Sequence, residues 1–299
     1  MHAPSPYSEL LNRIPATRRT VEVQGTRTVY WEYGSPDAET TIVAVHGFRG
    51  DHHGLEPIVG HLQGMRWIMP DLPGFGQTPS FTGQTHDLDA YAEWLGAFAR
   101  EVAPGSVILG HSFGSIVASA AVARGLATPR LVLVNPIGAP ALEGPRGILT
   151  RLAVFYYWAG ARLPERIGTW LLRTPVIVRV MSIAMAKTRD RALRRWIHSQ
   201  HARFFSGFAD RESLRQAFVT SVSHDVREAA GSILVPTLLV AAVHDDITPI
   251  AAERELRTMF AEATLVEIDD VGHLIHYEKP REAAEAIRGF LSDCAVGAA

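Results

Sequence analysis

Short, almost continuous runs of hydrophobic residues recur along the chain, and longer amphipathic segments separate them. Such short runs are typical of strands that are buried on both faces of a sheet. They occupy residues 41–45, 67–69, 107–109, 131–134, 237–241 and 264–268. Residues 19–23 and 27–33 alternate in character around Gln24-Gly25, which predicts an additional β-hairpin near the N-terminus.

The segments between these runs predict helices. Apolar residues recur at helical spacing across residues 87–102, and a second helix is predicted from residue 112 to about Arg124. Residues 251–260 and 280–291 follow the last two apolar runs and also predict helices. Because strands alternate with helices, we expect an α/β fold with a mostly parallel sheet that is covered on both faces.

Residues 138–225 interrupt this alternation, because they contain no run that indicates a strand. Their apolar clusters lie at helical spacing and are separated by Pro164, Pro175 and Gly207. We therefore expect four or five helices that form a lid, inserted into a core made of residues 1–137 and 226–299.

Charge is distributed unevenly between these two parts. The 299 residues carry a formal net charge of −2, which gives no indication of nucleic-acid binding. Residues 138–225, however, contain 14 basic and 6 acidic residues, whereas the remainder contains 15 and 25. The excess of arginine has two interpretations, which the sequence leaves open. The arginines either lie on solvent-exposed helix faces without a specific role, or they attract an anionic substrate or an anionic membrane surface.

Several classes of protein are disfavoured by composition. One cysteine, Cys294, excludes an internal disulfide framework and a cysteine-based metal cluster. The pair His52-His53 belongs to no Asp, Glu or His set whose spacing indicates a metal site, so no metal is predicted. The N-terminal segment lacks the apolar core of a signal peptide, and no uninterrupted apolar run reaches the ~18 residues of a membrane span. We expect a cytoplasmic protein without stable membrane insertion. The sequence is compatible with a homodimer.

The first candidate for chemistry is the segment Gly110-His111-Ser112-Phe113-Gly114. It matches the G-x-S-x-G pattern between a predicted strand and a predicted helix, where a sharp turn exposes the serine hydroxyl. Glycine at both ends lets the turn close against its neighbours. The amide of Phe113 would lie at a helix N-terminus, which favours a negatively charged oxygen. The alternative is a glycine-rich turn without chemistry.

A serine nucleophile requires a base, and the base requires a group that orients it. Asp245 and Asp246 follow the predicted strand at residues 237–241, and His273 follows the predicted strand at residues 264–268. Parallel strands place such residues together at the carboxyl edge of the sheet, where α/β folds build their sites. The order Ser…Asp…His is therefore compatible with a proton relay.

These motifs resemble those of the α/β-hydrolase superfamily, and the resemblance covers nearly the whole chain. His46-Gly47-Phe48 resembles the oxyanion loop of the family, the segment from Asp71 to Gly76 resembles its D-x-P-G-x-G loop, and Gly272-His273 matches its histidine region. The resemblance implies an eight-stranded, mostly parallel sheet flanked by helices, with an inserted helical lid. It favours Asp245 over Asp246, because the distance from Asp245 to Pro249 fits the family pattern.

The resemblance also implies a mechanism of acyl transfer that needs no cofactor. Ser112 would attack the carbonyl of an ester, His273 would move the proton, and Asp245 would orient His273. The backbone N–H groups of Phe48 and Phe113 would stabilise the oxyanion. A serine at this position argues against the dehalogenases and epoxide hydrolases of the family, whose nucleophile is an aspartate.

The predicted partner is a small-molecule ester. Aromatic residues of the lid, together with Phe48, predict an apolar pocket, and His46, His111 and Arg49 are predicted to contact the substrate. Arg49 could bind a carboxylate or form a structural ion pair. The loop at residues 46–55 resembles that of monoalkyl phthalate hydrolases, which implies a monoester with a free carboxylate. A carbon–carbon bond hydrolase, a cofactor-free haloperoxidase or perhydrolase, and a ligand receptor that keeps the triad remain alternatives.

Overall fold

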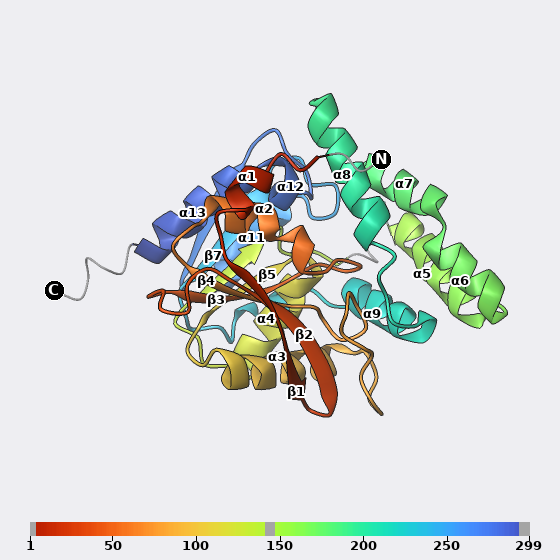
Figure 1. Ribbon diagram of the computed structural model, residues 1–299, viewed down its shortest axis with the longest axis horizontal. Coiled ribbons are helices and arrows are strands. Elements are labelled where there is room, and N and C mark those ends of the chain that lie inside the picture. Colours follow the sequence, from red (N-terminus) through yellow and green to blue (C-terminus); the bar gives the residue numbers. More distant parts are fainter. Residues whose placement is uncertain (1–3, 141–146, 293–299) are drawn as a thin grey trace.

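A single eight-stranded sheet forms the centre of the protein (Figure 1). The structure is a computed structural model that describes residues 4–140 and 147–292, so Cys294 lies outside it. The strand order is β1-β2-β4-β3-β5-β6-β7-β8. The strands are β1 (Ala16–Val23), β2 (Thr26–Tyr33), β3 (Thr41–Val45), β4 (Arg66–Pro70), β5 (Val107–His111), β6 (Leu131–Val134), β7 (Thr237–Ala242) and β8 (Ala263–Ile268).

Strands β3 to β8 pair in parallel, and only the N-terminal hairpin departs from this direction. β1 is antiparallel to β2, and β2 is antiparallel to β4. The predicted mostly parallel sheet is therefore confirmed, as is the predicted hairpin. All residues of β5 and β6 are buried, which explains the continuous apolar runs at residues 107–109 and 131–134.

Helices cover both faces of the sheet. One face packs against α3 (Leu88–Val102), α4 (Phe113–Ala123), α10 (Arg227–Ala230) and α11 (Ile250–Met259). The other face packs against α2 (Glu56–His61), α12 (Ile275–Glu278) and α13 (Pro280–Ser292), and two further short helices are α1 (Ser8–Leu11) and the 3₁₀ helix η1 (His52–Gly54). Successive residues of β5 alternate between these two cores: Ile108 belongs to one, and Val107 and Leu109 belong to the other.

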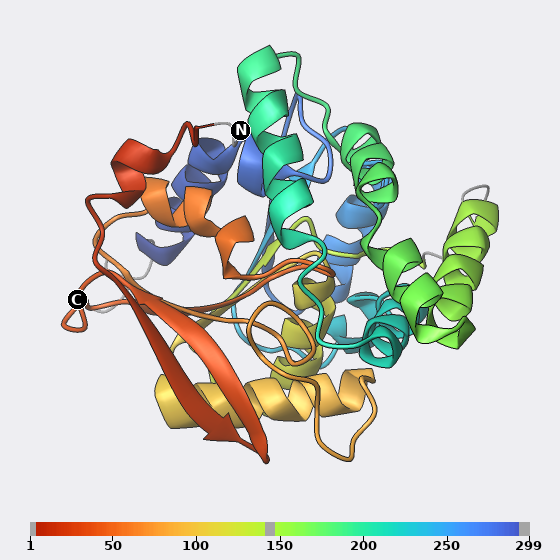
Figure 2. The ribbon, with the colours of Figure 1, turned by 45° about the vertical axis from the view of Figure 1, so that its right-hand side comes forward.

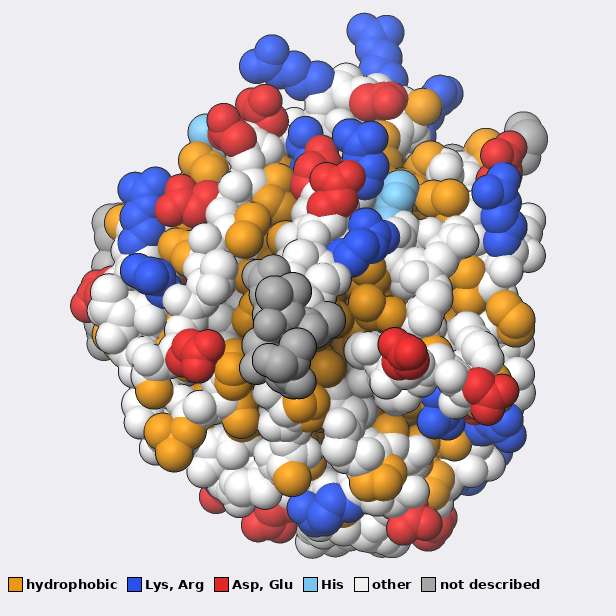
Figure 3. Space-filling model, turned by 90° about the vertical axis from the view of Figure 1, so that its left-hand side faces the viewer, with side chains coloured by type: hydrophobic (Ala, Val, Ile, Leu, Met, Phe, Trp, Pro, Cys, Tyr) orange, Lys and Arg blue, Asp and Glu red, His pale blue; other side chains and the backbone are white. Residues whose placement is uncertain are grey.

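Between β6 and α10 the described residues contain five helices, which we call the helical insertion. They are α5 (Gly147–Arg162), α6 (Glu165–Arg173), α7 (Pro175–Met185), α8 (Arg191–Phe204) and α9 (Arg211–Ser223). Residues 141–146 of the predicted lid lie outside the described part of the chain. Figures 1 and 2 show the five helices together on one side of the sheet, with α5 and α6 farthest from it. On the opposite side, acidic and basic side chains are intermingled with hydrophobic ones (Figure 3).

Candidate active site

Ser112 occupies the turn between β5 and α4, in a backbone conformation that side chains rarely adopt. Its φ is 54° and its ψ is −118°. The turn is closely packed, because a Cβ on Gly110 would lie 2.3 Å from the carbonyl oxygen of Gly114. A Cβ on Gly114 would lie 2.3 Å from the carbonyl oxygen of Val45, at the end of β3. Both glycines are therefore required for this turn, which holds Ser112 at the carboxyl edge of the sheet.

Three side chains that are distant in sequence meet at this edge. Ser112 Oγ donates a hydrogen bond to His273 Nε2 at 2.8 Å. His273 Nδ1 donates to Asp245 Oδ2 at 2.7 Å. The Asp245 and His273 side chains are buried, so little water competes for these contacts. The serine, the imidazole and the carboxylate form a continuous chain of hydrogen bonds, which is the geometry needed to move a proton away from the serine.

The surroundings of Asp245 keep its carboxylate ionised. Oδ1 accepts hydrogen bonds from the amides of Ile247 and Thr248, and Oδ2 accepts a further bond from Asn135 Nδ2. Burial alone would raise the pKa of Asp245, but the adjacent His273 ring and the two amides hold that pKa below its usual value. The ionised carboxylate can therefore stabilise a positive charge on His273.

The neighbouring acid points elsewhere. Asp246 is exposed, and its carboxylate forms an ion pair with Lys187 of the helical insertion. The structure thus distinguishes the two acids that the sequence leaves open, because the carboxylate of Asp245 is the one in contact with His273.

The loop that carries Phe48 lies directly against the serine. A Cβ on Gly47 would lie 3.2 Å from Ser112 Cβ and 3.1 Å from His111 Nδ1. The amide of Phe113 belongs to the first residue of α4, where an N–H has no acceptor within the helix. The Phe48 and Phe113 amides are therefore on two segments that meet at the nucleophile, as an oxyanion site requires.

His46 and His111 line the same cavity, and protein atoms hydrogen-bond both ring nitrogens of His46 but, among the described residues, not Nε2 of His111. His46 Nδ1 donates to the carbonyl of Gly47, and His46 Nε2 accepts from the amide of Leu72. His46 therefore joins the two loops beside the nucleophile. The His111 ring packs edge-on against His276 at 4.1 Å, and burial lowers the pKa of His111 to about 3. His111 is consequently neutral at pH 7.

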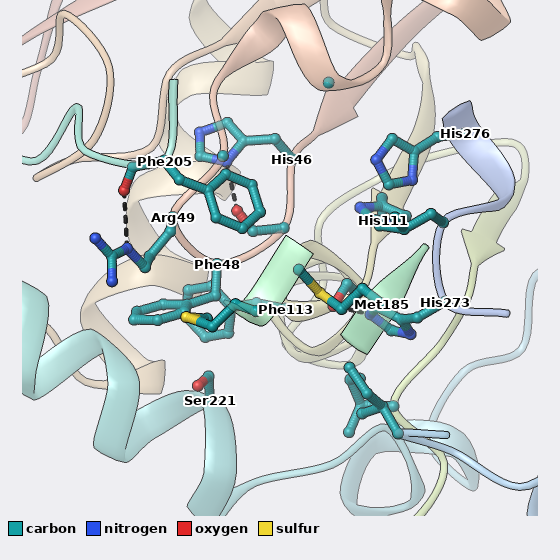
Figure 4. A pocket seen from close by; sticks show the side chains of 18 of the residues that line it. His46, Phe48, Arg49, His111, Phe113, Met185, Phe205, Ser221, His273 and His276 are labelled. Atoms are coloured by element: carbon teal, nitrogen blue, oxygen red, sulfur yellow. Dashed lines mark hydrogen bonds between the residues drawn. The ribbon is translucent and has the colours of Figure 1, made fainter. Parts of the chain in front are cut away.

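Arg49 lies on the opposite side of the cavity from His273 and points toward the helical insertion (Figure 4). Its side chain is fully buried. The guanidinium donates to the carbonyls of Phe205 and Leu172, each at 2.8 Å, and to the Tyr157 hydroxyl at 3.2 Å. Arg49 thus connects the core to the insertion, and three of its N–H groups are engaged by protein atoms.

The cavity between these groups is mainly apolar and has a volume of about 240 Å³. Its walls include Phe48, Phe113 and Phe218, together with Met181 and Met185 of α7. Figure 4 shows Met185 beside His273. The two methionines are not among the site residues predicted from the sequence. Unbranched apolar side chains on an amphipathic helix give no signal that distinguishes a cavity wall from ordinary packing.

Two groups of side chains bring potential metal ligands together, although the sequence predicts no metal site. Donor atoms of Asp51, His52 and His53 lie within 4.8 Å of one another. His52 Nδ1 already donates to Asp71, and His53 Nδ1 donates to Asp51. The second group, His244 with Asp269 and Asp270, is exposed. We assign no metal-binding role to either group.

Comparison with known proteins relates the chain to enzymes. Over 270 residues it is 25% identical to the biotin biosynthesis bifunctional protein BioHC of Cellvibrio japonicus, covering 85% of this chain and 48% of that protein. The chain therefore spans about half the length of this relative. It is also 23% identical over 281 residues to the uncharacterized hydrolase YugF of Bacillus subtilis, covering 91% of this chain and 97% of YugF.

Solved structures share the fold. The esterase EaEST of Exiguobacterium antarcticum superposes with a TM-score of 0.73 at 17% identity, covering 92% of this chain and 99% of the esterase. The model of one family, described as the alpha/beta hydrolase family, matches residues 42–286, which include the serine turn, Asp245 and His273. With most of its length matched by that model, the chain belongs to the alpha/beta hydrolase family.

Proposed function

We propose that this hydrolase cleaves carboxylic esters of small, largely apolar substrates through an acyl-enzyme. The hydrogen-bonded chain from Ser112 through His273 to Asp245 is the observation that carries the proposal. A fold alone does not determine a reaction, so the proposal depends on this site. The apolar cavity beside the serine supports an apolar acyl or alcohol group as the occupant.

Each step uses a contact described above. Ser112 Oγ attacks the ester carbonyl as its proton passes to His273 Nε2, and the carbonyl oxygen becomes an oxyanion. The amides of Phe48 and Phe113 stabilise that oxyanion. His273 then returns the proton to the leaving alcohol as the C–O bond breaks. Water, deprotonated by His273, attacks the acyl-enzyme and releases the acid and Ser112.

Asp245 contributes by fixing the imidazole. Its hydrogen bond to Nδ1 keeps the other ring nitrogen, Nε2, free to accept the serine proton. Its negative charge stabilises the imidazolium that forms when Ser112 reacts. Both effects require an ionised carboxylate, which agrees with the lowered pKa of Asp245.

Kinetics with a short p-nitrophenyl ester test the proposal. We expect Ser112→Ala and His273→Ala to lower kcat by on the order of 10⁴-fold or more, and Asp245→Asn by about 10⁴-fold. Asp246→Asn is the matched control, and it should retain activity because its carboxylate contacts Lys187. Retention of turnover by Ser112→Ala would refute the acyl-enzyme. Loss of turnover in Asp246→Asn, with Asp245→Asn active, would reverse the assignment of the acid.

A narrower version of the proposal is a monoester that carries a free carboxylate, such as a monoalkyl phthalate. Its support is that Arg49, a buried cation in the cavity wall, has no carboxylate within ion-pair distance in the described part of the chain. The carbonyl and hydroxyl partners of Arg49 already occupy three of its N–H groups, which weighs against a role in binding a substrate carboxylate. Hydrolysis rates on matched monoesters and diesters decide the point. Equal or faster turnover of the uncharged diester would exclude the monoester preference.

Related reactions use a similar triad, so assays for these reactions accompany the ester assays. A carbon–carbon bond hydrolase would act on a ring-cleavage product, and a perhydrolase would support peroxide-dependent halogenation in acetate. A ligand receptor would bind a small molecule tightly without turnover. We favour the esterase because both hydrogen bonds of the triad are formed and an apolar cavity adjoins the serine.

A further inference from the structure

Exposed large hydrophobic side chains are concentrated in one region of the described chain. Eleven such residues are markedly exposed, and nine of them lie between residues 152 and 183, on or between α5, α6 and α7. The other two, Leu234 and Ile247, lie elsewhere. Isolated exposed hydrophobic residues are normal, but a concentration of this kind indicates an interaction surface. We call the exposed hydrophobic side chains of residues 152–183 the outer face of the insertion.

Aromatic residues contribute much of this face. Phe155 and Trp158 of α5 are stacked with ring centroids 5.7 Å apart, and both are exposed. On α6, Trp170 is 67% exposed and Ile167 is 52% exposed, although α6 also packs Leu172 into the core. Tryptophan is enriched where an apolar phase meets water, because its ring is apolar and its N–H can remain hydrated.

Helix α7 has an apolar side chain in almost every direction. Val176, Val180 and Ile183 recur at helical spacing and are exposed. On another side of the same helix, Met181 and Met185 line the cavity that contains Ser112. The single helix α7 therefore lies between the outer face and the candidate active site.

The charges around this face are mainly positive. Residues 147–185 contain five arginines and a single acidic residue, Glu165. Arg162, Arg166 and Arg179 are exposed beside the hydrophobic residues. The opposite side of the molecule carries intermingled acidic and basic side chains (Figure 3). The rest of the chain is acidic, so an anionic surface would attract the insertion and repel the core.

The same segment is too interrupted to cross a membrane. By length and composition alone, Glu165–Met185 would be long and apolar enough to span a membrane. Only 22% of its most apolar window is buried within the protein, so most of this window is left uncovered. The helix is broken at Thr174, which has an extended conformation before Pro175. Its two parts, of 9 and 11 residues, are each shorter than the ~20 residues of a spanning helix. Such helices fit the plane of an interface.

We propose that the outer face of the insertion docks on a lipid bilayer whose surface carries anionic head groups. The exposed tryptophans and aliphatic side chains enter the boundary between head groups and acyl chains, and the flanking arginines pair with the head-group phosphates. A second copy of this chain fits the face less well, because pairing two outer faces would bring two arginine-rich surfaces together. Docking in this orientation places the α7 wall of the cavity next to the lipid.

Co-sedimentation with sucrose-loaded vesicles tests the proposal without any substrate. We expect the wild-type chain to bind vesicles of phosphatidylcholine with phosphatidylglycerol more tightly than vesicles of phosphatidylcholine alone, and salt to weaken the difference. Trp170→Glu/Val180→Glu should lower binding roughly tenfold or more, because two anchors are lost and two negative charges are added. Arg166→Gln should lower binding to the anionic vesicles by about fivefold.

Leu234→Glu is the matched control, because Leu234 is exposed outside the insertion. It should bind vesicles as the wild type does, and circular dichroism with hydrolysis of a soluble ester establishes that every variant is folded. Unchanged vesicle binding by Trp170→Glu/Val180→Glu would overturn the proposal, and so would equal binding to neutral and anionic vesicles. Dimerisation that this double variant abolishes, without vesicle binding by the wild type, would identify the face as an interface between two copies.

Discussion

Two buried carboxyl groups close to the candidate relay are held in opposite protonation states. Asp245 accepts hydrogen bonds from backbone amides and contacts His273, so its pKa is lowered. Glu253 of α11 is equally buried and lies against Gly138. Burial, and then the negative charge of Asp245, raise the pKa of Glu253 to about 9. Glu253 is therefore protonated at pH 7 and adds no negative charge beside Asp245.

The Glu253→Gln variant tests this assignment through the pH dependence of stability. Above pH 4.5 the unfolded chain carries Glu253 ionised, whereas the folded protein keeps it protonated up to about pH 9. Folding therefore takes up a proton in this window, and the free energy of unfolding falls by up to about 1.4 kcal/mol per pH unit. Glutamine removes this slope, so urea unfolding should show the variant gaining stability relative to the wild type between pH 5 and pH 8.

The comparison with the wild type cancels the other titrating groups of the chain. A constant difference in unfolding free energy across this range would show that Glu253 is ionised in the folded protein. Turnover of a soluble ester should be nearly unchanged at pH 7, since a neutral amide replaces a neutral carboxyl group.

At the scale of elements, the strand–turn–helix around Ser112 depends on close backbone packing. Gly114 lies in the first turn of α4. Because it has no side chain, the carbonyl oxygen of Val45 can pack directly against it. Because that contact involves backbone on both sides, neither partner can rotate away. We expect Gly114→Ala to destabilise the protein by roughly 3 kcal/mol or more, or to prevent folding, as measured by urea unfolding.

Gly231→Ala is the matched control for this prediction. Gly231 has a φ of −67°, and nothing lies within 4 Å of a Cβ built on it. Alanine there should change stability by less than about 1 kcal/mol and should tend to stabilise, because it restricts the unfolded chain. Equal effects of the two substitutions would show that close packing at Gly114 is not what the turn requires.

The sequence could predict the features that depend on local patterns, but not those that depend on contacts between distant residues. The parallel strands are short apolar runs and the N-terminal hairpin alternates around Gln24-Gly25, so all eight strands and the long helices α3, α11 and α13 were predictable. Helices α2 and α12 contain six and four residues, too few to show a helical period. Asp245 and His273 could be placed at one edge because both follow parallel strands. The role of Asn135, which donates to Asp245 across 110 residues, has no local signal.

At the scale of the whole molecule, a small number of contacts hold the insertion over the candidate active site. Arg49 has a φ of 60°, in the left-handed region, and follows Phe48 in the loop beside the nucleophile. It reaches the Leu172 carbonyl and the Phe205 carbonyl, at the ends of α6 and α8, and the Tyr157 hydroxyl in α5. Three helices of the insertion are thus connected through one side chain that adjoins Phe48. The position of the insertion and the geometry of the oxyanion site are therefore linked.

The Arg49→Met variant separates this linking role from recognition of a substrate carboxylate. Methionine keeps much of the side-chain volume but leaves two buried carbonyls without their donor, at a cost of roughly 1–3 kcal/mol for each. We expect faster hydrogen exchange in α5, α6 and α8 and lower kcat on charged and uncharged esters alike, whereas Arg49→Lys should restore part of both. If Arg49 instead served only to bind a substrate carboxylate, exchange in the insertion would stay at the wild-type rate. Turnover would then fall for monoesters alone, because a diester has no carboxylate to lose.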